Sequence, residues 1–386
     1  MLLVQPSPEL QSYIRITFNE NPETRQRDLD SIKTWLRQQP HLPDAWDEQR
    51  IMTFLRGCNF SLERCKRKLD MYFTMKTAVP EFFRNRDVAR PELRQILKQA
   101  HLVCMPGLTP DGKRVSIAGA SPDFHLTNVA DLFKLLTMMA DVRLDAEKFG
   151  VAGDVYILDA AATSLTRQFL KMSPVLLKKF FVCVQEAYPV KIKEVHVVNA
   201  GPVVEMVMAV VRPLLKEKLR SRIHLHSRLE SLHQFVPKEL LPEEYGGSAG
   251  RLEEVKENWT RTLEEYGGWF KEQEGVGADE TRRPGRPTSY DTLFGVEVLQ
   301  VNCSIKSPPS SRITFRMGDR IAELFRDRTV LVTGGSGFLG KVLVEKLLRC
   351  CGVHRVYLLV RSKKGKSAQE RLDDIFSNVS MRRFKI

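Results

Sequence analysis

The stretch that decides the fold runs from Val195 to His226 and reads VHVVNAGPVVEMVMAVVRPLLKEKLRSRIHLH. It opens with a strand of the buried type, Val195–Asn199, and a Gly-Pro break follows. The next segment, Val203–Leu215, is an apolar helix with one Glu and one Arg, and a second short strand, Ile223–Leu225, ends the stretch. This order of strand, helix and strand predicts one repeat of an α/β sheet.

The apolar helix admits two interpretations. A helix that is hydrophobic on nearly every side is normally core or membrane, and this one is shorter than the ~20 apolar residues that span a bilayer. Four basic residues follow it immediately: Lys216, Lys218, Arg220 and Arg222. It is therefore either an ordinary core helix with a solvated charged end, or an apolar flap that opens beside these four basic residues at an anionic membrane.

The composition narrows the class of protein. A length of 386 residues predicts two or three domains, and a formal net charge of +13 favours anionic partners. We find no zinc-type Cys/His spacing, RNP-like motif or long basic tract, so lipid headgroups are favoured over nucleic acid. The seven Cys have no regular spacing, and the first residues do not resemble a signal peptide. These features predict a cytoplasmic protein, peripheral on membranes, and we expect a monomer.

The hydrophobic pattern of the chain changes near residue 100. Residues 1 to about 85 have apolar residues at helical spacing throughout. Strand patterns at Arg114–Ala118 and Asp154–Asp159 then alternate with helical patterns at Asn128–Lys148 and Pro174–Tyr188. We therefore expect an α/β fold with a mainly parallel sheet behind a helical N-terminal lobe.

Six short motifs occur in order along this region. They are FLRGC at residues 54–58, VYILD at 155–159, YPVK at 188–191, HVVN at 196–199, RIHLH at 222–226 and LPEEYGG at 241–247. Through them, residues 25–247 resemble the CRAL-TRIO (Sec14-like) family, and most of all insect proteins related to the α-tocopherol transfer protein. The resemblance implies a helical lobe over residues 1–90, an α/β lipid-binding domain over 91–250, and a gate helix at about Val203–Leu215.

The same resemblance implies a cavity for a hydrophobic ligand such as a tocopherol or a retinoid, with no cofactor and no catalytic residue. Its wall would consist of Phe133, Leu136, Ala140, Val155, Ile157, Phe180, Cys183, Val184 and Val195. Its lid would contribute Val203, Val207, Val210, Val211 and Leu214. The alternative is a filled core made of the same residues.

The resemblance also implies that a phosphatidylinositol bisphosphate headgroup binds beside the gate. Lys191, Lys218 and Arg222 fall on the matching positions. Cys58 stands where the relative has a further arginine, so one contact of the headgroup is missing. The alternative is a solvated charged face.

Three histidines, His196, His224 and His226, lie on neighbouring strands and raise the question of a metal site. No carboxylate or Cys accompanies them at ligand spacing. We therefore predict ordinary sheet histidines and no metal.

The last part of the chain changes character again. Residues 251–311 predict a terminal helix followed by a disordered linker rich in Gly, Pro, Ser and charge. Residues 312–386 contain a strand, Thr329–Thr333, a Gly-rich turn, a helix, Lys341–Cys350, and a second strand, Arg355–Arg361. This block resembles the start of a fatty acyl-CoA reductase and predicts a truncated Rossmann βαβ unit.

The Gly-rich turn carries the chemistry of this block. Gly334, Gly337 and Gly340 would let the backbone approach a pyrophosphate at the helix N-terminus, with Phe338 and Leu339 in the same turn. Arg361 at the end of the second strand suits the 2′-phosphate of NADP. The catalytic Tyr and Lys of that family have no counterpart in residues 312–386, so an NADPH-dependent, alcohol-forming reductase is the alternative function. A third possibility is that two neighbouring genes were joined by an erroneous gene model.

Overall fold

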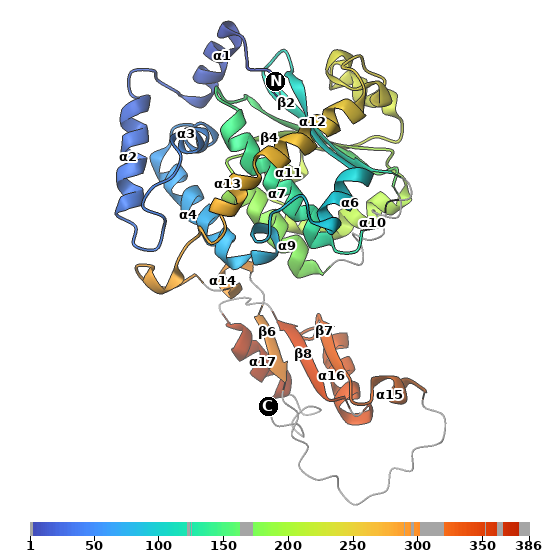
Figure 1. Ribbon diagram of the computed structural model, residues 1–386. Coiled ribbons are helices and arrows are strands. Elements are labelled where there is room, and N and C mark those ends of the chain that lie inside the picture. The colour runs from blue at the N-terminus through green and yellow to red at the C-terminus, as the bar shows by residue number, and fades with distance from the viewer. Residues whose placement is uncertain are drawn as a thin grey trace, which may run out of the picture. The chain divides into compact units, whose positions relative to one another are not determined.

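The computed structural model describes residues 3–121, 124, 126–162, 173–288, 290–294, 297–301, 320–351, 353–360 and 366–377. The chain divides into two compact units, Met1–Pro287 and Thr288–Ile386 (Figure 1). The helical lobe and the α/β lobe, expected as two domains, form one unit. In the part of the chain that is described, no helix is both long and apolar enough to cross a bilayer.

The first unit begins with helices, as the sequence predicts. They are α1 (Pro8–Phe18), α2 (Arg25–Arg37), α3 (Glu48–Gly57), α4 (Leu62–Ala78), α5 (Pro80–Phe83) and α6 (Pro91–Gln99). Apolar residues at helical spacing face inward: Leu29, Ile32 and Leu36 of α2 are all buried. A helical region at the N-terminus is therefore confirmed.

A five-stranded sheet follows, with strand order β1-β2-β3-β4-β5. Its members are β1 (Ala100–Leu108), β2 (Lys113–Ala120), β3 (Gly153–Asp159), β4 (Ile192–Val198) and β5 (Ile223–Leu225). The first pair, β1 with β2, is antiparallel, and the remaining pairs are parallel. The expected mainly parallel sheet is confirmed, whereas β1 was not among the strands predicted from the sequence.

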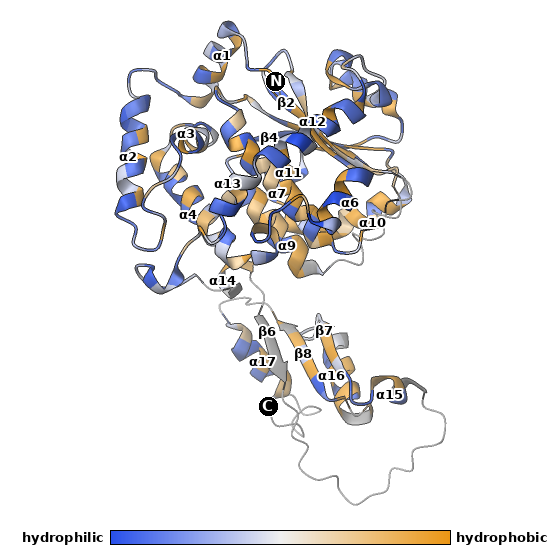
Figure 2. Cartoon of the chain, viewed as in Figure 1, coloured by the Kyte–Doolittle hydropathy of each residue, from blue (hydrophilic) through white to orange (hydrophobic). Residues whose placement is uncertain are grey.

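The helices that connect the parallel strands lie on one face of this sheet. They are α7 (Val129–Ala146), α9 (Pro174–Val182) and α10 (Pro202–Val211). The strands are added in chain order, and crossovers between parallel strands are right-handed, so successive connections stay on the same side. Figure 2 shows that α7 and α9 are largely hydrophobic, as expected for helices that cover a sheet.

The opposite face is covered by the chain that follows β5. It folds into three short 3₁₀ turns, η3 (Leu229–Gln234), η4 (Lys238–Leu240) and η5 (Glu243–Tyr245). Ile157 of β3 pairs with His196 of β4, whose ring centroid lies 5.1 Å from that of Phe235 in this segment. Because side chains alternate along a strand, Val155 lies on the same side as Ile157, and both residues face away from α7 and α10.

One buried carboxylate joins the helical lobe to α7. Asp141 Oδ1 accepts hydrogen bonds from the Tyr72 hydroxyl at 2.9 Å and from the Tyr188 hydroxyl at 2.8 Å. Its other oxygen lies 2.5 Å from Nη1 of Arg86. Arg86 and Asp141 are almost completely buried, so the ion pair holds the segment between α5 and α6 against α7, and the Tyr72 hydroxyl holds α4 there.

The segment predicted to be a disordered linker is partly ordered on the first unit. After α12 (Leu252–Glu265) and α13 (Gly267–Glu272), the Ala278 N–H donates to the Phe73 carbonyl at 3.0 Å. Arg283 then reaches both carboxylate oxygens of Asp70, at 2.8 and 2.9 Å. The Gly, Pro, Ser and charge content of the segment predicted a linker. The sequence could not show the order, because ion pairs between distant residues leave no local signal.

The second unit is a small α/β sheet with strand order β6-β8-β7. Its elements are α14 (Tyr290–Phe294), β6 (Glu297–Val301), α15 (Arg320–Phe325), β7 (Thr329–Thr333), α16 (Phe338–Cys350), β8 (Arg355–Val360) and α17 (Ala368–Phe376). The parallel pair β7 and β8, connected by α16, forms the expected βαβ unit. The antiparallel strand β6 lies inside the stretch predicted as linker.

Candidate functional site

An apolar cavity of about 380 Å³ lies between the sheet and the helices α7, α9 and α10. Nine of the residues expected in a ligand-binding wall or lid line it. They are Phe133, Leu136, Ala140, Phe180, Cys183, Val184, Val195, Val207 and Val211. Phe133 and Phe180 stack with ring centroids 4.1 Å apart, so their two helices meet at one end of the cavity.

Five expected residues do not line this cavity. Val155 and Ile157 point to the opposite face because side chains alternate along a strand, and Tyr156 and Leu158 take their places. Val203, Val210 and Leu214 of the expected lid are likewise absent from the wall. The inward side of α10 is formed by Val204, Val207, Met208 and Val211, so two predicted lid residues are joined by Val204 and Met208.

The outward side of α10 is also apolar. Met206 is 52% exposed and Val210 is 40% exposed, whereas Val204 and Met208 are buried. The helix therefore separates the cavity from the surface with hydrophobic side chains on both sides. An exposed apolar face on a helix that covers an apolar cavity is unusual for a helix that serves only as core.

The three residues expected to hold a phosphoinositide lie close to the start of β4 and to the turn before β5. Lys191 directly precedes β4, and the Arg222 guanidinium donates to the carbonyl of Ile192, the next residue. Lys218 is exposed on α11 (Glu217–Arg220), the helical turn that precedes Arg222. The structure thus brings Arg222 to the backbone beside Lys191, with Lys218 one turn earlier in the chain.

Lys191 differs from Lys218 and Arg222 in that its ammonium group is partly buried. Its ammonium group lies 3.7 Å from the centroid of the Phe18 ring and donates to the Asn59 side chain. Burial lowers the pKa of Lys191 from 10.5 to about 7, and the nearby charge of Lys193 acts in the same direction. Lys191 is therefore a cation that is only partly charged at neutral pH until an anion approaches.

Sequence reasoning missed Lys68 of α4. Its ammonium group donates to the carbonyls of Tyr188, at 2.7 Å, and of Gln185, at 3.1 Å. Lys68 and Lys191 both act electrostatically on Cys58, the position where the family resemblance left a missing arginine. We call Lys68, Lys191, Lys218 and Arg222 the cationic rim.

The packing of α3 against the segment that contains Lys191 depends on Gly57. A Cβ at this position would lie 2.2 Å from the Pro189 carbonyl oxygen.

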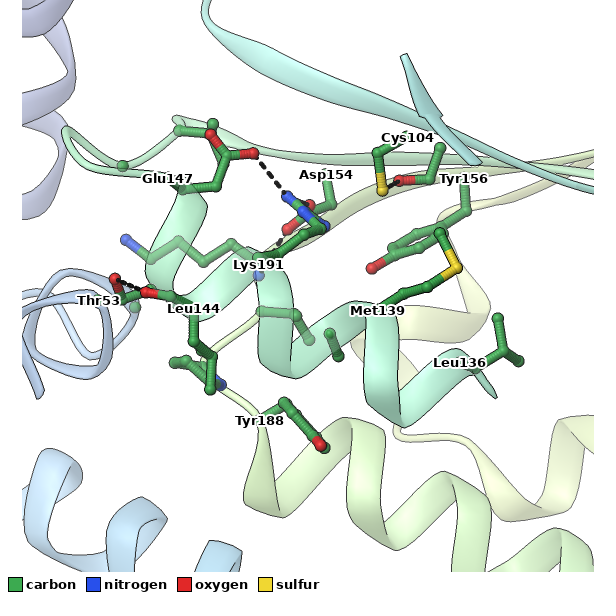
Figure 3. Close-up of a pocket in the computed structure, with 18 of the residues that line it drawn as sticks. Thr53, Cys104, Leu136, Met139, Leu144, Glu147, Asp154, Tyr156, Tyr188 and Lys191 are labelled. Carbon is green, nitrogen blue, oxygen red and sulfur yellow. Dashed lines mark hydrogen bonds and ion pairs between the residues drawn. The ribbon is translucent and has the colours of Figure 1, made fainter. Parts of the chain in front are cut away.

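A second, smaller cavity of about 140 Å³ adjoins the apolar one (Figure 3). Both cavities are lined by Leu136, Ala140, Tyr156, Tyr188 and Val190. The smaller cavity differs in kind, because charged side chains contribute to its wall. We call it the polar end of the cavity.

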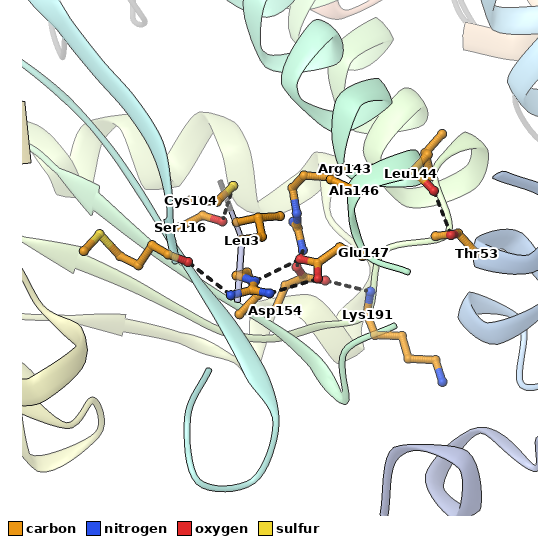
Figure 4. Close-up of polar contacts among 12 residues, drawn as sticks. Leu3, Thr53, Cys104, Ser116, Arg143, Leu144, Ala146, Glu147, Asp154 and Lys191 are labelled. Atoms are coloured by element: carbon orange, nitrogen blue, oxygen red, sulfur yellow. Dashed lines mark hydrogen bonds and ion pairs between the residues drawn. The ribbon is translucent and has the colours of Figure 1, made fainter. Parts of the chain in front are cut away.

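Four charged residues, Arg114, Arg143, Glu147 and Asp154, form a cluster at the polar end, and Figure 4 labels the last three. Arg56 and Lys191 also line this cavity. Nη2 of Arg143 lies 2.7 Å from Asp154 Oδ1 and 3.3 Å from Glu147 Oε1. Glu147 also receives two hydrogen bonds from the fully buried Arg114, at 2.9 and 3.0 Å. Although burial opposes it, these guanidinium groups hold the pKa of the Glu147 carboxyl below its ordinary value. Two cations and two carboxylates give the cluster no net charge.

The sequence analysis did not select this cluster. Arg143 and Glu147 have the i, i+4 spacing of an ordinary helix-surface ion pair, and Asp154 begins an apolar strand. Only Asp154 lies in an apolar stretch, which is unusual for a solvated charge, whereas Arg143 and Glu147 belong to the charged run at residues 141–148.

The three histidines lie together on the far face of the sheet, and two of them hydrogen-bond each other. Nδ1 of His196 lies 2.9 Å from Nε2 of His226, and Nδ1 of His226 lies 2.6 Å from the Ser231 hydroxyl. Nε2 of His196 lies 3.2 Å from Glu194, and burial lowers the pKa of His196 to about 4. Over the described residues, the structure has no group of three or more side chains placed to hold a metal ion.

The Gly-rich turn of the second unit has the geometry that close packing of strand and helix requires. Gly334 has φ of +71°, and a Cβ on Gly340 would lie 2.2 Å from the Gly334 carbonyl oxygen. A Cβ on Gly337 would lie 3.3 Å from the same oxygen. These positions fit a backbone that approaches a pyrophosphate. The side chains of Phe338 and Leu339 and the whole of Arg361 lie outside the described residues.

Three protein families match consecutive parts of the chain. The Pinta-like UBA domain family matches residues 21–93, the CRAL/TRIO domain family matches residues 98–247, and the male sterility protein family, an NAD-binding family, matches residues 332–385.

Relatives and one solved structure match over about two thirds of the chain. The human alpha-tocopherol transfer protein-like protein is 29% identical over 274 residues, 67% of this chain and 78% of that protein. The mouse counterpart is 30% identical over 66% of this chain and 74% of that protein, and human Clavesin-2 is 28% identical over 67% and 79%. The crystal structure of Sfh5 covers 69% of this chain and 98% of its own at 11% identity and a TM-score of 0.40, and no site residue is taken from it.

The sheet, the helices that cover it and the match to the CRAL/TRIO domain family define the class of this protein, an α/β protein with an apolar cavity. The chain belongs to the CRAL-TRIO family. The resemblance inferred from the six motifs is thereby confirmed, and so is the reductase-like character of the C-terminal block.

Proposed function

We propose that residues 1–287 form a cytoplasmic lipid-binding and transfer protein that docks on membranes containing phosphatidylinositol bisphosphate. The observation that carries this proposal is the apolar cavity closed by α10, a helix whose outward side exposes Met206 and Val210. A cavity of this size can hold the hydrocarbon part of a small lipid. Removal of apolar surface from water contributes roughly 25 cal/mol per Å², so few polar contacts are needed.

Release of the lipid requires that α10 move. Gly201 precedes the helix with open space around its Cα, and Pro202 forms the first helical residue. On a membrane, the outward residues Met206 and Val210 would enter the acyl region while the inward residues uncover the cavity. The cationic rim would hold the headgroup beside this gate, since a basic residue near an anionic membrane contributes ~1 kcal/mol.

The direct test is mass spectrometry of lipid extracted from the full-length chain, purified from the cells in which it is naturally made. One hydrophobic species at near-stoichiometric amount is expected. A chain that is purified without lipid and takes up none from vesicles would contradict the carrier function.

The headgroup assignment has its own test. Replacing Lys191, Lys218 and Arg222 together with Ala should abolish sedimentation with vesicles that contain phosphatidylinositol bisphosphate. The matched control replaces three exposed basic residues outside the cationic rim, Lys98, Arg251 and Lys271, and should bind nearly as well as the wild type. Unchanged binding of the first variant would remove the rim from the proposal.

We also propose that the second unit binds NADP, on the observation that its Gly-rich turn packs β7 against α16 at the distances given above. When bound, the dinucleotide would place its pyrophosphate at the N-terminus of α16, with backbone N–H groups of the turn as donors. Titration with NADPH should give saturable binding that is lost in Gly337→Trp. Absence of saturation in the wild type would contradict this second function.

A further inference from the structure

The buried guanidinium group of Arg86 has one edge without a partner. Its Nη1 lies 2.5 Å from Asp141 Oδ2, whereas Nε and Nη2 are buried and have no hydrogen-bond partner among the described residues. Nε and Nη2 lie on the same edge of a guanidinium group, so their N–H bonds form a fork that fits an anion. The similarly buried Arg56 differs, because its Nε and Nη2 both donate to Glu20 and its Nη1 donates to the Lys148 carbonyl. We call Nε and Nη2 of Arg86 the free edge.

Lys76 of α4 is a second buried cation that acts on the same place. It is 6% exposed, and its ammonium group donates to Gln273 Oε1 at 3.2 Å and lies 5.6 Å from the centroid of the Tyr72 ring. Burial lowers the pKa of Lys76 to about 8, and the charges of Arg86 and Arg50 act in the same direction. At neutral pH most molecules therefore carry a charged Lys76 close to a charged Arg86.

One carboxylate serves both of these cations. Asp141 pairs with Arg86, and its charge raises the pKa of Lys76 against the effect of burial. The hydroxyls of Tyr72 and Tyr188 that donate to Asp141 stay neutral, because burial raises the pKa of each well above its ordinary value. Two cations and one carboxylate leave one positive charge uncompensated.

The other charges near this place are engaged elsewhere. The Arg50 guanidinium lies 3.5 Å from Asp47, and the Asp145 carboxylate lies 2.8 Å from the Lys148 ammonium group. Glu274 is exposed, so water screens its charge. A buried charge without a counter-charge is costly, and so is a buried N–H without an acceptor. A ligand that is both an anion and an acceptor would remove both costs.

The surroundings of Arg86 limit the kind of anion. Three aromatic rings have centroids 4.9, 5.7 and 5.9 Å from its guanidinium carbon, those of Phe270, Phe83 and Trp269. These rings offer no polar group to a large oxyanion. A monovalent anion cancels the one uncompensated charge, whereas a divalent anion would leave a buried negative charge in its place.

We propose that a small monovalent anion, for which chloride is the probe, binds at the free edge of Arg86 with Lys76 as its second cation. The site would join α4 and α7 to the segment between α5 and α6. It would also attach α13, which supplies Trp269 and Phe270 and ends beside Gln273. Neither Arg86 nor Lys76 lines the apolar cavity or its polar end, so this inference is independent of lipid binding.

The test is urea unfolding of the full-length chain, followed by tryptophan fluorescence, in sodium chloride and in sodium gluconate at equal ionic strength. Gluconate is the comparison because it is a monovalent anion too large for a small buried site. Binding to the folded state multiplies the folding equilibrium constant by about 16 at about 150 mM chloride, for a dissociation constant of about 10 mM. The unfolding midpoint of the wild type should therefore be higher in chloride.

Two variants test the geometry and the charge separately. Arg86→Lys keeps a cation opposite Asp141 but lacks the free edge, whereas Lys76→Met keeps Arg86 and Asp141 but removes the uncompensated charge. In each variant the chloride effect on the folding equilibrium constant should fall to about threefold or less. Lys76→Met decides the question if Arg86→Lys does not fold.

The matched control is Arg283→Lys. Arg283 also contacts α4, through Asp70, but it pairs with Glu280 as well and lies outside the proposed site. This variant should be less stable than the wild type and should keep the full chloride effect. The control therefore separates general loss of stability, and general effects of salt, from loss of the anion site.

Two results would overturn the proposal. Equal unfolding of the wild type in chloride and in gluconate would show that no chloride is bound and would leave water as the partner of the free edge. A chloride effect of the same size in the wild type, Arg86→Lys and Lys76→Met would show that chloride binds elsewhere on this basic protein.

Discussion

Asp154 and Lys191 are joined by two hydrogen bonds that link the polar end of the cavity to the cationic rim. The Lys191 N–H donates to Asp154 Oδ2 at 3.3 Å, and the Asp154 N–H donates to the Lys191 carbonyl at 2.9 Å. The backbone of Lys191 is therefore fixed to β3. Its side chain extends away from Asp154 (Figure 4), and its ammonium group lies against the ring of Phe18 in a poorly solvated position.

This position predicts that docking on phosphoinositide vesicles depends on pH. The pKa of Lys191 is about 7 because burial disfavours the charged form, so the free protein loses this charge between pH 6 and pH 8. An anionic headgroup binds the charged form, and binding above pH 7 must take up a proton. Affinity should therefore fall as pH rises from 6 to 8, by up to roughly tenfold.

The control for this effect is Lys191→Arg, because an arginine stays charged over the whole range. Vesicle sedimentation with this variant should show a much flatter pH profile, whereas Lys218→Arg should keep the slope of the wild type. A slope that persists in Lys191→Arg would assign the titration to another group, such as the headgroup phosphate.

The buried carboxylate of Asp141 predicts a large effect on stability. Asp141→Asn leaves the guanidinium of Arg86 without its partner in a site that excludes water. The free energy of unfolding of the first unit should fall by about 3–5 kcal/mol. All four tryptophans, Trp35, Trp46, Trp259 and Trp269, lie within residues 1–287, so fluorescence during urea unfolding reports this unit.

Tyr72→Phe serves as the comparison for Asp141→Asn. It removes one hydrogen bond to the same carboxylate but leaves the ion pair in place. The loss should be smaller, about 1.5–3 kcal/mol. Equal and small losses in the two variants would show that Asp141 contributes little to the attachment of the helices to α7.

The sequence predicted the elements of the α/β lobe because their signals are local. The run from Asp154 to Asp159 is apolar throughout, and the Gly-Pro break before α10 marks where the helix begins. The family resemblance placed Val155 and Ile157 in the wall of the cavity. The alternation of side chains along the strand permits the other choice as well, and Tyr156 and Leu158 are the residues that line the cavity.

Other features could not be predicted because they depend on distant residues. The contacts of Lys68 with the carbonyls of Gln185 and Tyr188, and of Arg283 with Asp70, join segments more than a hundred residues apart. The polar end of the cavity also depends on tertiary packing. Asp154 and Arg143 are close in the sequence, but they form an ion pair only because β3 packs against α7. A single sequence shows the charges but not which of them become neighbours.

The outward side of α10 predicts how the protein binds membranes. Met206→Glu with Val210→Glu places two charges where apolar side chains would enter the bilayer, while the inward side of the helix is unchanged. Burial of a Met or Val side chain contributes about 1.5–3 kcal/mol, so partitioning onto vesicles should fall more than tenfold. Binding of a lipid delivered in solution should remain.

A control for nonspecific surface effects is Ile16→Glu on α1, since Ile16 is 77% exposed and lies outside both cavities. Its partitioning should match that of the wild type. If the α10 variant partitions as the wild type does, α10 does not enter the membrane and the cationic rim alone accounts for docking.

The Gly-rich turn predicts a difference between two glycine substitutions in the second unit. Gly340→Ala places a Cβ 2.2 Å from the Gly334 carbonyl oxygen, whereas Gly337→Ala places one 3.3 Å from it. Because backbone atoms cannot move aside easily, we expect Gly340→Ala to destabilise the β7–α16 packing by about 2–3 kcal/mol and Gly337→Ala by much less. Amide hydrogen exchange of residues 329–360 would measure this, and tryptophan fluorescence should show an unchanged first unit in both variants. Equal protection of the two variants would mean that α16 does not pack on β7 as closely as these distances require.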